Sequence, residues 1–154
     1  MVTIMHLFKS IFILLITPLF LSGCGSSPTI IKSHITVSED VNPDITGRAS
    51  PVVIRVYELK SLGNFDSADF YSLYENYETA LRTDLTGTEQ FLLGPGETQS
   101  YKQTTSDETS FIGVIAAFRE LDKAVWKDSI SVVPKKNSEV TISLEKLSVK
   151  ITKK

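Results

Sequence analysis

The sequence contains 154 residues, which is long enough for one domain with a hydrophobic core after an N-terminal leader is removed. Its formal charge at pH 7 is −2, with 16 Lys and Arg residues against 18 Asp and Glu residues. This balance lacks the strongly basic field of nucleic-acid-binding proteins, and a single cysteine leaves the chain without an internal disulfide.

The N-terminal segment has the pattern of a bacterial signal peptide. Lys9 supplies a positive charge, and the apolar run of residues 11–21 has about the length of the hydrophobic region in such peptides. The run is too short to cross a membrane as a helix, and it contains Pro18. The sequence therefore predicts a signal peptide over residues 1–23, whose removal with Lys9 changes the formal charge from −2 to −3.

Cys24, the only cysteine, directly follows the predicted cleavage site. The run Leu21-Ser22-Gly23-Cys24 resembles the bacterial lipobox, in which the thiol receives diacylglycerol and the new N-terminus receives another acyl chain. We therefore predict lipid, including palmitate, on Cys24 and no other cofactor; the alternative is an ordinary signal peptide followed by a chance cysteine. Two or three acyl chains would hold the protein on a bilayer, since each buried methylene contributes about 0.8 kcal/mol. Gly25 stands where aspartate commonly signals inner-membrane retention, so we expect outer-membrane delivery.

The predicted mature chain begins with a tether and continues into one domain. Residues 24–32 are expected to form the acylated N-terminus and a flexible tether, because small and polar residues dominate there. The domain is predicted over residues 33–154, with its first strand at residues 33–38. Residues 52–59 are β-branched and apolar on both faces, which predicts a second strand that is covered on both sides.

The hydrophobic period changes to that of a helix at about residues 67–85. Apolar and aromatic side chains recur there at helical spacing, namely Phe70, Tyr74, Tyr77 and Leu81. This pattern predicts one amphipathic helix whose aromatic residues pack on the sheet. Asp66 or Ser67 is suited to cap its N-terminus, and Tyr71 is expected to be exposed because it lies about 100° around the helix from Phe70.

Short extended segments follow the predicted helix, at residues 89–93, 97–104, 111–118, 126–133 and 140–151. The segment from Phe111 to Phe118 is apolar on both faces and is predicted to be a buried central strand, whereas the polar segment before it is typical of a sheet edge. In the last segment the apolar residues change parity, which requires a bulge or a break near residues 145–146. Seven or eight strands and one helical insertion favour a mainly β fold, a β-sandwich, over one sheet covered by a helix.

No group of residues forms a recognisable catalytic or metal-binding motif. His34 is the one histidine left after the leader is removed, and it has no cysteine or second histidine as a co-ligand. The acidic residues between Glu39 and Asp44 lack the spacing of a calcium-binding EF-hand, and no Gly-x-Ser-x-Gly nucleophile turn is present. We therefore predict a protein that is not an enzyme and that binds no metal ion, nucleic acid or small-molecule substrate.

Several groups of residues stand in a characteristic order along the mature chain. They are Asn42-Pro43, Gly47-Arg48, Ser50-Pro51-Val52, Arg55-Val56-Tyr57-x-Leu59, Phe65 with Ala68-Asp69-Phe70, Pro95-Gly96-Glu97, residues 112–119 and Trp126. Together, behind a lipobox, they resemble the TssJ family, also called SciN or VasD, the lipoproteins of the type VI secretion system. The similarity covers essentially the whole mature chain, and Ala49 departs from it because proline is common at that position.

The resemblance implies a transthyretin-like β-sandwich of seven to eight strands with a helical insertion. It also implies an outer-membrane lipid anchor, a domain that faces the periplasm, and one main partner, the periplasmic C-terminal region of the inner-membrane protein TssM. TssM with TssL would complete a non-catalytic trans-envelope assembly. In that family the loop between the first two strands is a principal contact, which corresponds here to about residues 39–50. The alternative is a stand-alone periplasmic lipoprotein that binds a ligand or peptide.

The loop of residues 39–50 also has features of an interface in its own right. It is longer than a hairpin connection requires, and its prolines lower the cost of ordering on binding. Val41 and Ile45 are apolar among polar neighbours, so we expect both to be exposed anchors. The predicted partner-binding residues are Val41, Asn42, Pro43, Asp44, Ile45, Gly47 and Arg48. The alternative is that these residues only form turns, with Gly47 in a left-handed conformation.

Overall fold

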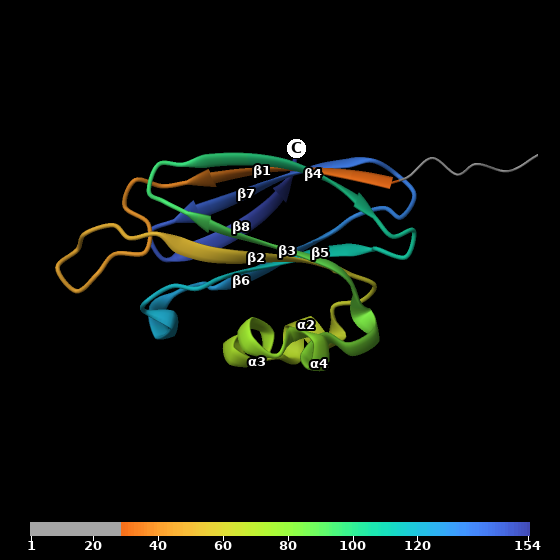
Figure 1. Ribbon diagram of the computed structural model, residues 1–154, viewed down its shortest axis with the longest axis horizontal. Coiled ribbons are helices and arrows are strands. Elements are labelled where there is room, and N and C mark those ends of the chain that lie inside the picture. Colours follow the sequence, from red (N-terminus) through yellow and green to blue (C-terminus); the bar gives the residue numbers. More distant parts are fainter. Residues whose placement is uncertain (1–28) are drawn as a thin grey trace, which may run out of the picture.

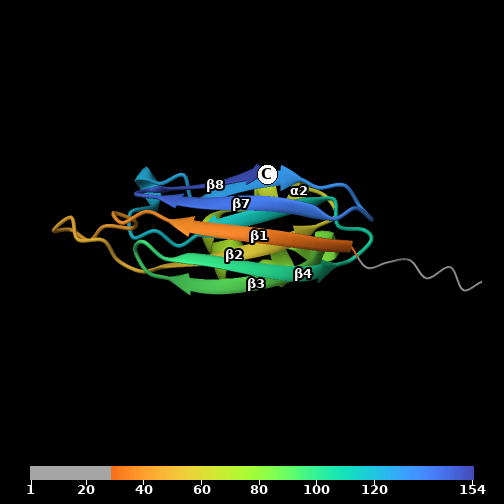
Figure 2. The ribbon, with the colours of Figure 1, turned by 90° about the horizontal axis from the view of Figure 1, so that it is seen from above.

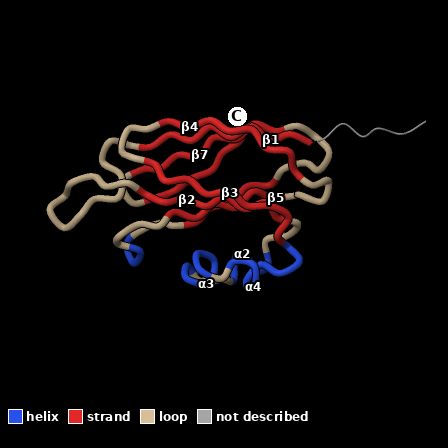
Figure 3. Tube along the Cα trace, viewed as in Figure 1, coloured by secondary structure: helices blue, strands red, loops and turns tan. Residues whose placement is uncertain are grey.

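Two four-stranded sheets stack face to face, and a group of short helices covers the outer face of one of them (Figures 1 and 3). The computed structural model describes residues 29–154, so the predicted signal peptide and Cys24 lie outside the described residues. None of the helices within residues 29–154 has the length and apolar character needed to cross a membrane. The β-sandwich with a helical insertion that the sequence predicts is confirmed.

The first sheet has the strand order β4-β1-β7-β8 (Figure 2). Its strands are β1 (Thr29–Val37), β4 (Thr98–Thr105), β7 (Ser138–Glu145) and β8 (Ser148–Lys153). β1 pairs antiparallel with β4 and parallel with β7, and β4 forms an edge as predicted. Residues 29–32 belong to β1, so the prediction that they form a flexible tether is wrong. Ile31 points into the core, and the backbone of this segment pairs with β4.

The second sheet has the strand order β3-β2-β5-β6, and all its pairs are antiparallel. Its strands are β2 (Val52–Leu59), β3 (Leu85–Leu93), β5 (Phe111–Ala116) and β6 (Lys127–Ser131). β2 has the bounds that the sequence predicts, and β5 lies between β2 and β6, which confirms the predicted central strand. The parity change predicted near residues 145–146 is a turn between β7 and β8, whose strands form a hairpin.

The main core lies between the inner faces of the two sheets. Alternate residues of the central strands point inward, so Ile35, Ile54, Val114 and Ile142 are all fully buried. Phe118 follows β5 and packs into the same cluster with 4% of its surface exposed. The two-sided apolar pattern of β5 therefore serves two cores, one between the sheets and one beneath the helices.

Phe118→Ala should lower the free energy of unfolding by roughly 3–5 kcal/mol, because it removes a buried aromatic ring and leaves a cavity in the main core. Urea unfolding followed by circular dichroism measures the effect. Tyr71→Ala is the matched control, since Tyr71 is 63% exposed and should cost little. A loss below about 0.5 kcal/mol for Phe118→Ala would show that the ring does not carry core packing.

The prediction of a single helix over residues 67–85 is wrong. Residues 63–84 form three short helices and a 3-10 turn: α2 (Gly63–Ser67), α3 (Phe70–Glu75), α4 (Tyr77–Leu81) and η1 (Arg82–Asp84). Asp69 has an extended backbone, and its side chain accepts a hydrogen bond from Ser72 N at 2.9 Å, so it starts α3 in place of the predicted caps. Asn76 leaves helical geometry and separates α3 from α4.

Side chains from the second sheet hold the ends of these helices. Lys127 Nζ donates to three backbone carbonyl oxygens at the end of α2, at distances of 2.8 to 3.1 Å. Arg55 Nη1 donates to Tyr74 O at 2.6 Å, and Tyr57 OH donates to Leu73 O at 2.6 Å. Burial raises the pKa of Tyr57 to about 12, so its hydroxyl remains a donor. The unpaired carbonyl groups of short helices are thereby satisfied, which fixes the helices on the sheet.

Glu58 of β2 points between the two sheets and is only 7% exposed. Its carboxylate accepts a hydrogen bond from Gln103 Nε2 at 2.8 Å and a weak one from Thr109 Oγ1 at 3.5 Å. Gly87 stands opposite on β3, where a Cβ atom would lie 2.8 Å from the carboxyl carbon. Burial raises the pKa of Glu58, because the charged form is poorly solvated.

Glu58→Gln should increase stability at pH 7 and flatten its pH dependence. A carboxyl group whose pKa is raised on folding binds its proton more tightly in the folded state. Glu58 therefore stabilises the folded protein at pH values below the pKa that it has in the unfolded chain. This stabilisation is lost as the pH rises through the pKa that Glu58 has in the folded protein. Thermal unfolding of both proteins at pH 4 and pH 7 tests this, with Glu78→Gln as an exposed control. A Glu58→Gln protein less stable than the parent at pH 7 would contradict the expectation.

Candidate interaction surface at the loop end of the sandwich

Four connections meet at the end of the sandwich that lies opposite the start of β1 (Figure 1). They are the β1–β2 loop (38–51), the β3–β4 turn (94–97), the β5–β6 segment (117–126) and the β7–β8 turn (146–147). Backbone hydrogen bonds join neighbouring connections: Gly96 N donates to Ser38 O at 3.4 Å, and Val125 N donates to Leu147 O at 2.9 Å. We call the surface formed by these four connections the loop end.

The base of the β1–β2 loop is part of the fold. Val41 is fully buried in the main core, so the prediction that it is an exposed anchor is wrong. Ser50 N donates to Val41 O at 3.1 Å, which closes the loop below its tip. Val41 fills the space where the two sheets part at this end, and its apolar character reflects packing rather than contact with a partner.

Asn42 joins three of the four connections and is 3% exposed. Its backbone N–H donates to Lys146 O at 2.9 Å, and its side-chain Nδ2 donates to Pro51 O at 2.8 Å. Its Oδ1 accepts from Arg119 N at 2.8 Å. Its φ angle of 48° lies in the left-handed region, which asparagine tolerates better than most residues. Asn42 therefore positions the loop and presents little of its own surface to a partner.

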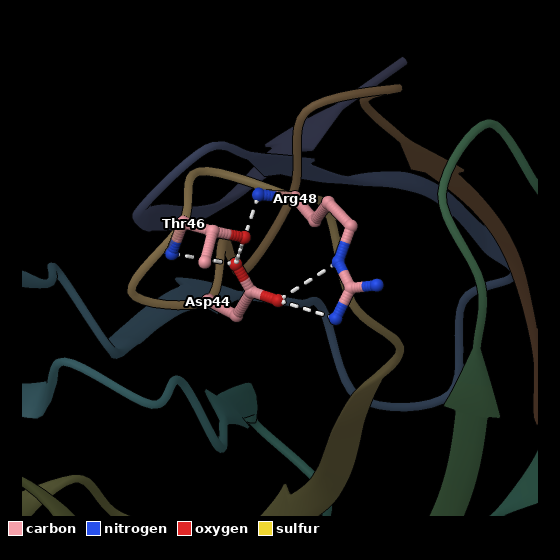
Figure 4. A network of polar contacts seen from close by, with 3 residues as sticks. All are labelled: Asp44, Thr46 and Arg48. Carbon is pink, nitrogen blue, oxygen red and sulfur yellow. Dashed lines mark hydrogen bonds and ion pairs between the residues drawn. The ribbon is translucent and has the colours of Figure 1, made fainter.

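A single carboxylate organises the tip of the loop (Figure 4). Asp44 Oδ1 accepts hydrogen bonds from Thr46 N at 2.8 Å, Thr46 Oγ1 at 2.6 Å and Arg48 N at 3.0 Å. Asp44 Oδ2 accepts from Arg48 Nε at 3.0 Å and Nη2 at 2.9 Å. Gly47 closes the turn with a φ of 83°, as the left-handed alternative predicts. These bonds hold residues 44–48 in one compact conformation.

The electrostatics of the tip favour a structural carboxylate over a metal ligand. Hydrogen bonds from the Thr46 hydroxyl, together with the bonds from Arg48, hold the pKa of Asp44 well below its usual range. The Arg48 guanidinium neutralises the charge, and both carboxylate oxygens already have donors. Across residues 29–154, no three His, Cys, Asp or Glu side chains stand close enough together to hold a metal ion.

Ile45 is the apolar residue that the tip presents to solvent. Its relative exposure is 101%, so the side chain packs against nothing in its own chain. The surrounding hydrogen bonds fix the backbone on both sides, so the residue is held on a short, ordered turn. Such a side chain loses little conformational freedom when it enters a pocket of a partner.

The predicted partner-binding residues thus divide into two groups. Asp44, Ile45, Gly47 and Arg48 form the tip, and Pro43 lies half-buried between tip and base. Val41 and Asn42 form the buried base. Sequence reasoning assigned no contact role to Arg119, although it lies within the family-like run of residues 112–119. Its exposed side chain belongs to the loop end, because its backbone bonds to Asn42.

Two residues considered in the sequence lie away from the loop end. His34 is exposed on the outer face of the first sheet, where its Nδ1 lies 2.7 Å from Ser100 Oγ. Tyr71 of α3 is 63% exposed, as expected, and its ring contacts Phe70 edge-on at 5.5 Å between centroids.

Residues 29–147 match the family model of the type VI secretion lipoproteins described as VasD, EvfM, TssJ and VC_A0113. A search of curated proteins found no match. Among solved structures, the type VI secretion lipoprotein TssJ1 from Pseudomonas aeruginosa is 32% identical to this chain. The alignment covers 83% of this chain and 98% of TssJ1, with a TM-score of 0.79.

Two further structures have the same architecture. Serratia marcescens Lip, a membrane-bound component of the type VI secretion system, is 26% identical, with a TM-score of 0.75. That alignment covers 82% of this chain and 99% of Lip. A chain of a type VI membrane complex is 24% identical to this chain, with a TM-score of 0.71. The alignment covers 82% of this chain and 99% of that one, and at this identity it supports only the fold.

Proposed function

This chain belongs to the TssJ (SciN/VasD) family of type VI secretion lipoproteins, and from this membership we propose its role. It is a non-catalytic lipoprotein that is anchored in the outer membrane through lipid on Cys24 and faces the periplasm. Its loop end binds the periplasmic C-terminal region of TssM. Through TssM and TssL the assembly connects the outer to the inner membrane.

The observation that carries the proposed contact is the geometry of the loop tip. Ile45 is fully exposed on a turn that Asp44 holds in one conformation. Interfaces are dominated by a few anchors that enter pockets of the partner, and anchors on rigid turns bind at a smaller entropic cost. Arg48 within the tip and Arg119 next to the loop base have exposed side chains, and exposed polar groups are typical of the rim of an interface.

The arrangement of anchor and contact also suits a connecting role. β1 starts at Thr29, five residues after Cys24, and the β1–β2 loop begins where β1 ends. At about 3.3 Å per residue, the nine residues of β1 separate these two points by roughly 30 Å. The loop end therefore lies opposite the start of β1, so the lipid anchor does not cover it and a periplasmic partner has access to it.

Co-purification from bacterial envelopes tests the proposal. The acylated protein carries a tag after Lys154, because β8 runs away from the loop end. Envelopes are solubilised in mild detergent, and the recovered proteins are identified by mass spectrometry. We expect TssM and TssL, and direct binding of the purified TssM periplasmic domain. Recovery of a different periplasmic protein, or of a small ligand without TssM, would support the stand-alone binding lipoprotein instead.

A further inference from the structure

Figure 2 looks onto the outer face of the β4-β1-β7-β8 sheet. The outward residues of its strands make this face rich in lysine. Alternation along the strands places Lys32, Lys102, Lys150 and Lys154 on this face together with Glu139 and Glu145. The remaining outward residues are mostly serines and threonines. We call this surface the lysine face. Its formal charge is positive, although the sequence as a whole has a charge of −2.

The charged residues form a row across all four strands. Lys102 of β4 is directly opposite Lys32 of β1, and Lys32 is opposite Glu139 of β7. Lys154 follows β8 and pairs with Glu139, with Nζ and Oε1 3.0 Å apart. None of the ion pairs within residues 29–154 includes Lys32 or Lys102. Lys32 therefore shares Glu139 with Lys154, and Lys102 has no ion-pair partner among the described residues.

The direct juxtaposition of Lys32 and Lys102 is unfavourable for the isolated domain, because like charges opposite one another on neighbouring strands repel. Lysines on edge strands commonly prevent sheets from pairing with other chains, which accounts for Lys102 on β4. This role does not account for Lys32, because β1 is paired on both sides. An external anion that lies against both ammonium groups removes the repulsion.

The lysine face also has a hollow that suits a compact anion. Its volume is about 360 Å³, and three lysines line it together with His34 and one carboxylate, namely Lys32, Lys102, Lys154 and Glu139, so its charged groups are mostly cationic. The ammonium groups supply charged donors to acceptor oxygens, and phosphate is the common biological group that offers several such oxygens. Small serine and threonine side chains around the hollow leave the face open to a broad, flat partner.

The length of chain before β1 identifies the partner. Thr29 follows Cys24 by only five positions, a stretch that spans at most about 18 Å when fully extended. Lys32 lies three residues into β1, about 10 Å from its start. A domain on so short a tether stays next to the bilayer, and β1 is the strand that continues from the tether. The lysine face is therefore the charged surface closest to the lipid along the chain.

We propose that the lysine face binds the anionic phospholipid headgroups of the membrane that holds the lipid anchor. This inference rests on the proposed acylation of Cys24. Lys32 and Lys102 contact the phosphate groups, and Lys150 and Lys154 extend the contact across β8. The sandwich then lies with its first sheet against the headgroups and its helices toward the periplasm, which orients the loop end along the membrane surface.

The acylated protein in vesicles tests the proposal. Vesicles are made of phosphatidylcholine alone or of equal parts phosphatidylcholine and phosphatidylglycerol, and flotation first establishes that the protein is bound. A water-soluble amine reagent then modifies the lysines, and mass spectrometry measures the rate at each one. On anionic vesicles we expect Lys32, Lys102 and Lys150 to react about fivefold more slowly than on neutral ones, as for lysines near an anionic surface. High salt should abolish this protection. Lys60, directly after β2, and Lys123, in the β5–β6 segment, lie off the lysine face and should not change.

Matched variants separate the lysine face from total charge. Lys32→Gln/Lys102→Gln should remove the protection of Lys150, while Lys60→Gln/Lys123→Gln should retain it at the same net charge. The first variant should fold, because it relieves a repulsive pair. A protein that floats but shows equal rates on both vesicles would overturn the proposal and leave the anchor intact. Protection that appears only when the TssM domain is added would assign the face to a protein partner instead. A protein that does not float would refute the anchor and the proposal together.

Discussion

Ile45→Asp should weaken binding to the TssM periplasmic domain at least tenfold, which corresponds to about 1.4 kcal/mol. The parent side chain is fully exposed on an ordered turn, so it has the position of an interface anchor. Aspartate removes its apolar contacts and places an unpaired charge in the contact region. The substitution should leave stability unchanged, because Ile45 packs against nothing in its own chain. Isothermal titration calorimetry measures the affinity, and circular dichroism measures the fold.

The matched control for Ile45→Asp is Leu92→Asp. Leu92 is another exposed apolar residue, at 68% exposure, and it lies on β3 of the second sheet. It should tolerate the same change without loss of TssM binding. Asp44→Ala is a further variant that keeps Ile45 but frees the turn, and it should weaken binding less than Ile45→Asp. Equal affinity of the parent and Ile45→Asp proteins would move the interface away from the tip, with the helix surface around Tyr71 as the next region to test.

Cys24→Ser should abolish incorporation of labelled palmitate and remove the protein from the outer-membrane fraction. A serine hydroxyl does not replace the thiol as the acceptor of diacylglycerol, so the variant loses its acyl chains. Cell fractionation and radiolabelling measure the two effects. Folding of the domain should be unaffected, because β1 begins at Thr29 and the core is built from residues after it.

Gly25→Asp is the control for Cys24→Ser, because it keeps the thiol and changes only the next residue. It should retain the palmitate label and shift the protein toward the inner membrane, where aspartate after the acylated cysteine is commonly a retention signal. Label that persists in Cys24→Ser would refute acylation at this position. Label that is lost in Gly25→Asp as well would point to a processing defect rather than to loss of the acceptor.

The sequence predicted those strands whose hydrophobic pattern directly reflects the burial of their two faces. β2 and β5 are apolar on both faces because one face meets the other sheet and the opposite face meets the helices. The start of β1 was missed because the small and polar residues just before Ile30 resemble a linker, and the strand β4 that pairs with this segment is distant in sequence. The hairpin of β7 and β8 was visible only as a break in parity, since Lys146 and Leu147 carry no glycine or proline signal.

The helical segment and the loop show where sequence patterns are ambiguous. Phe70 and Leu81 share a helical period, but Asn76 leaves helical geometry between them and the helix starts again at Tyr77. A hydrophobic period alone does not report such a restart. Val41 and Ile45 are equally apolar in a polar loop, yet one is fully buried and the other fully exposed. The hydrogen bonds of Asn42 decide this difference, because they draw the loop base into the sandwich.

The position of β1 has a consequence for a protein held at one end and pulled at the other. A load between the lipid and the loop end runs along β1, which enters the sheet at Thr29 and leaves it at Val37. On one side of β1, the hydrogen bonds to β4 lie perpendicular to that direction. On its other side, a second set of hydrogen bonds joins β1 to β7. The load therefore acts on both ladders in shear, so many bonds share it at once instead of opening one after another. An edge strand in the same place would have only one ladder to resist the pull.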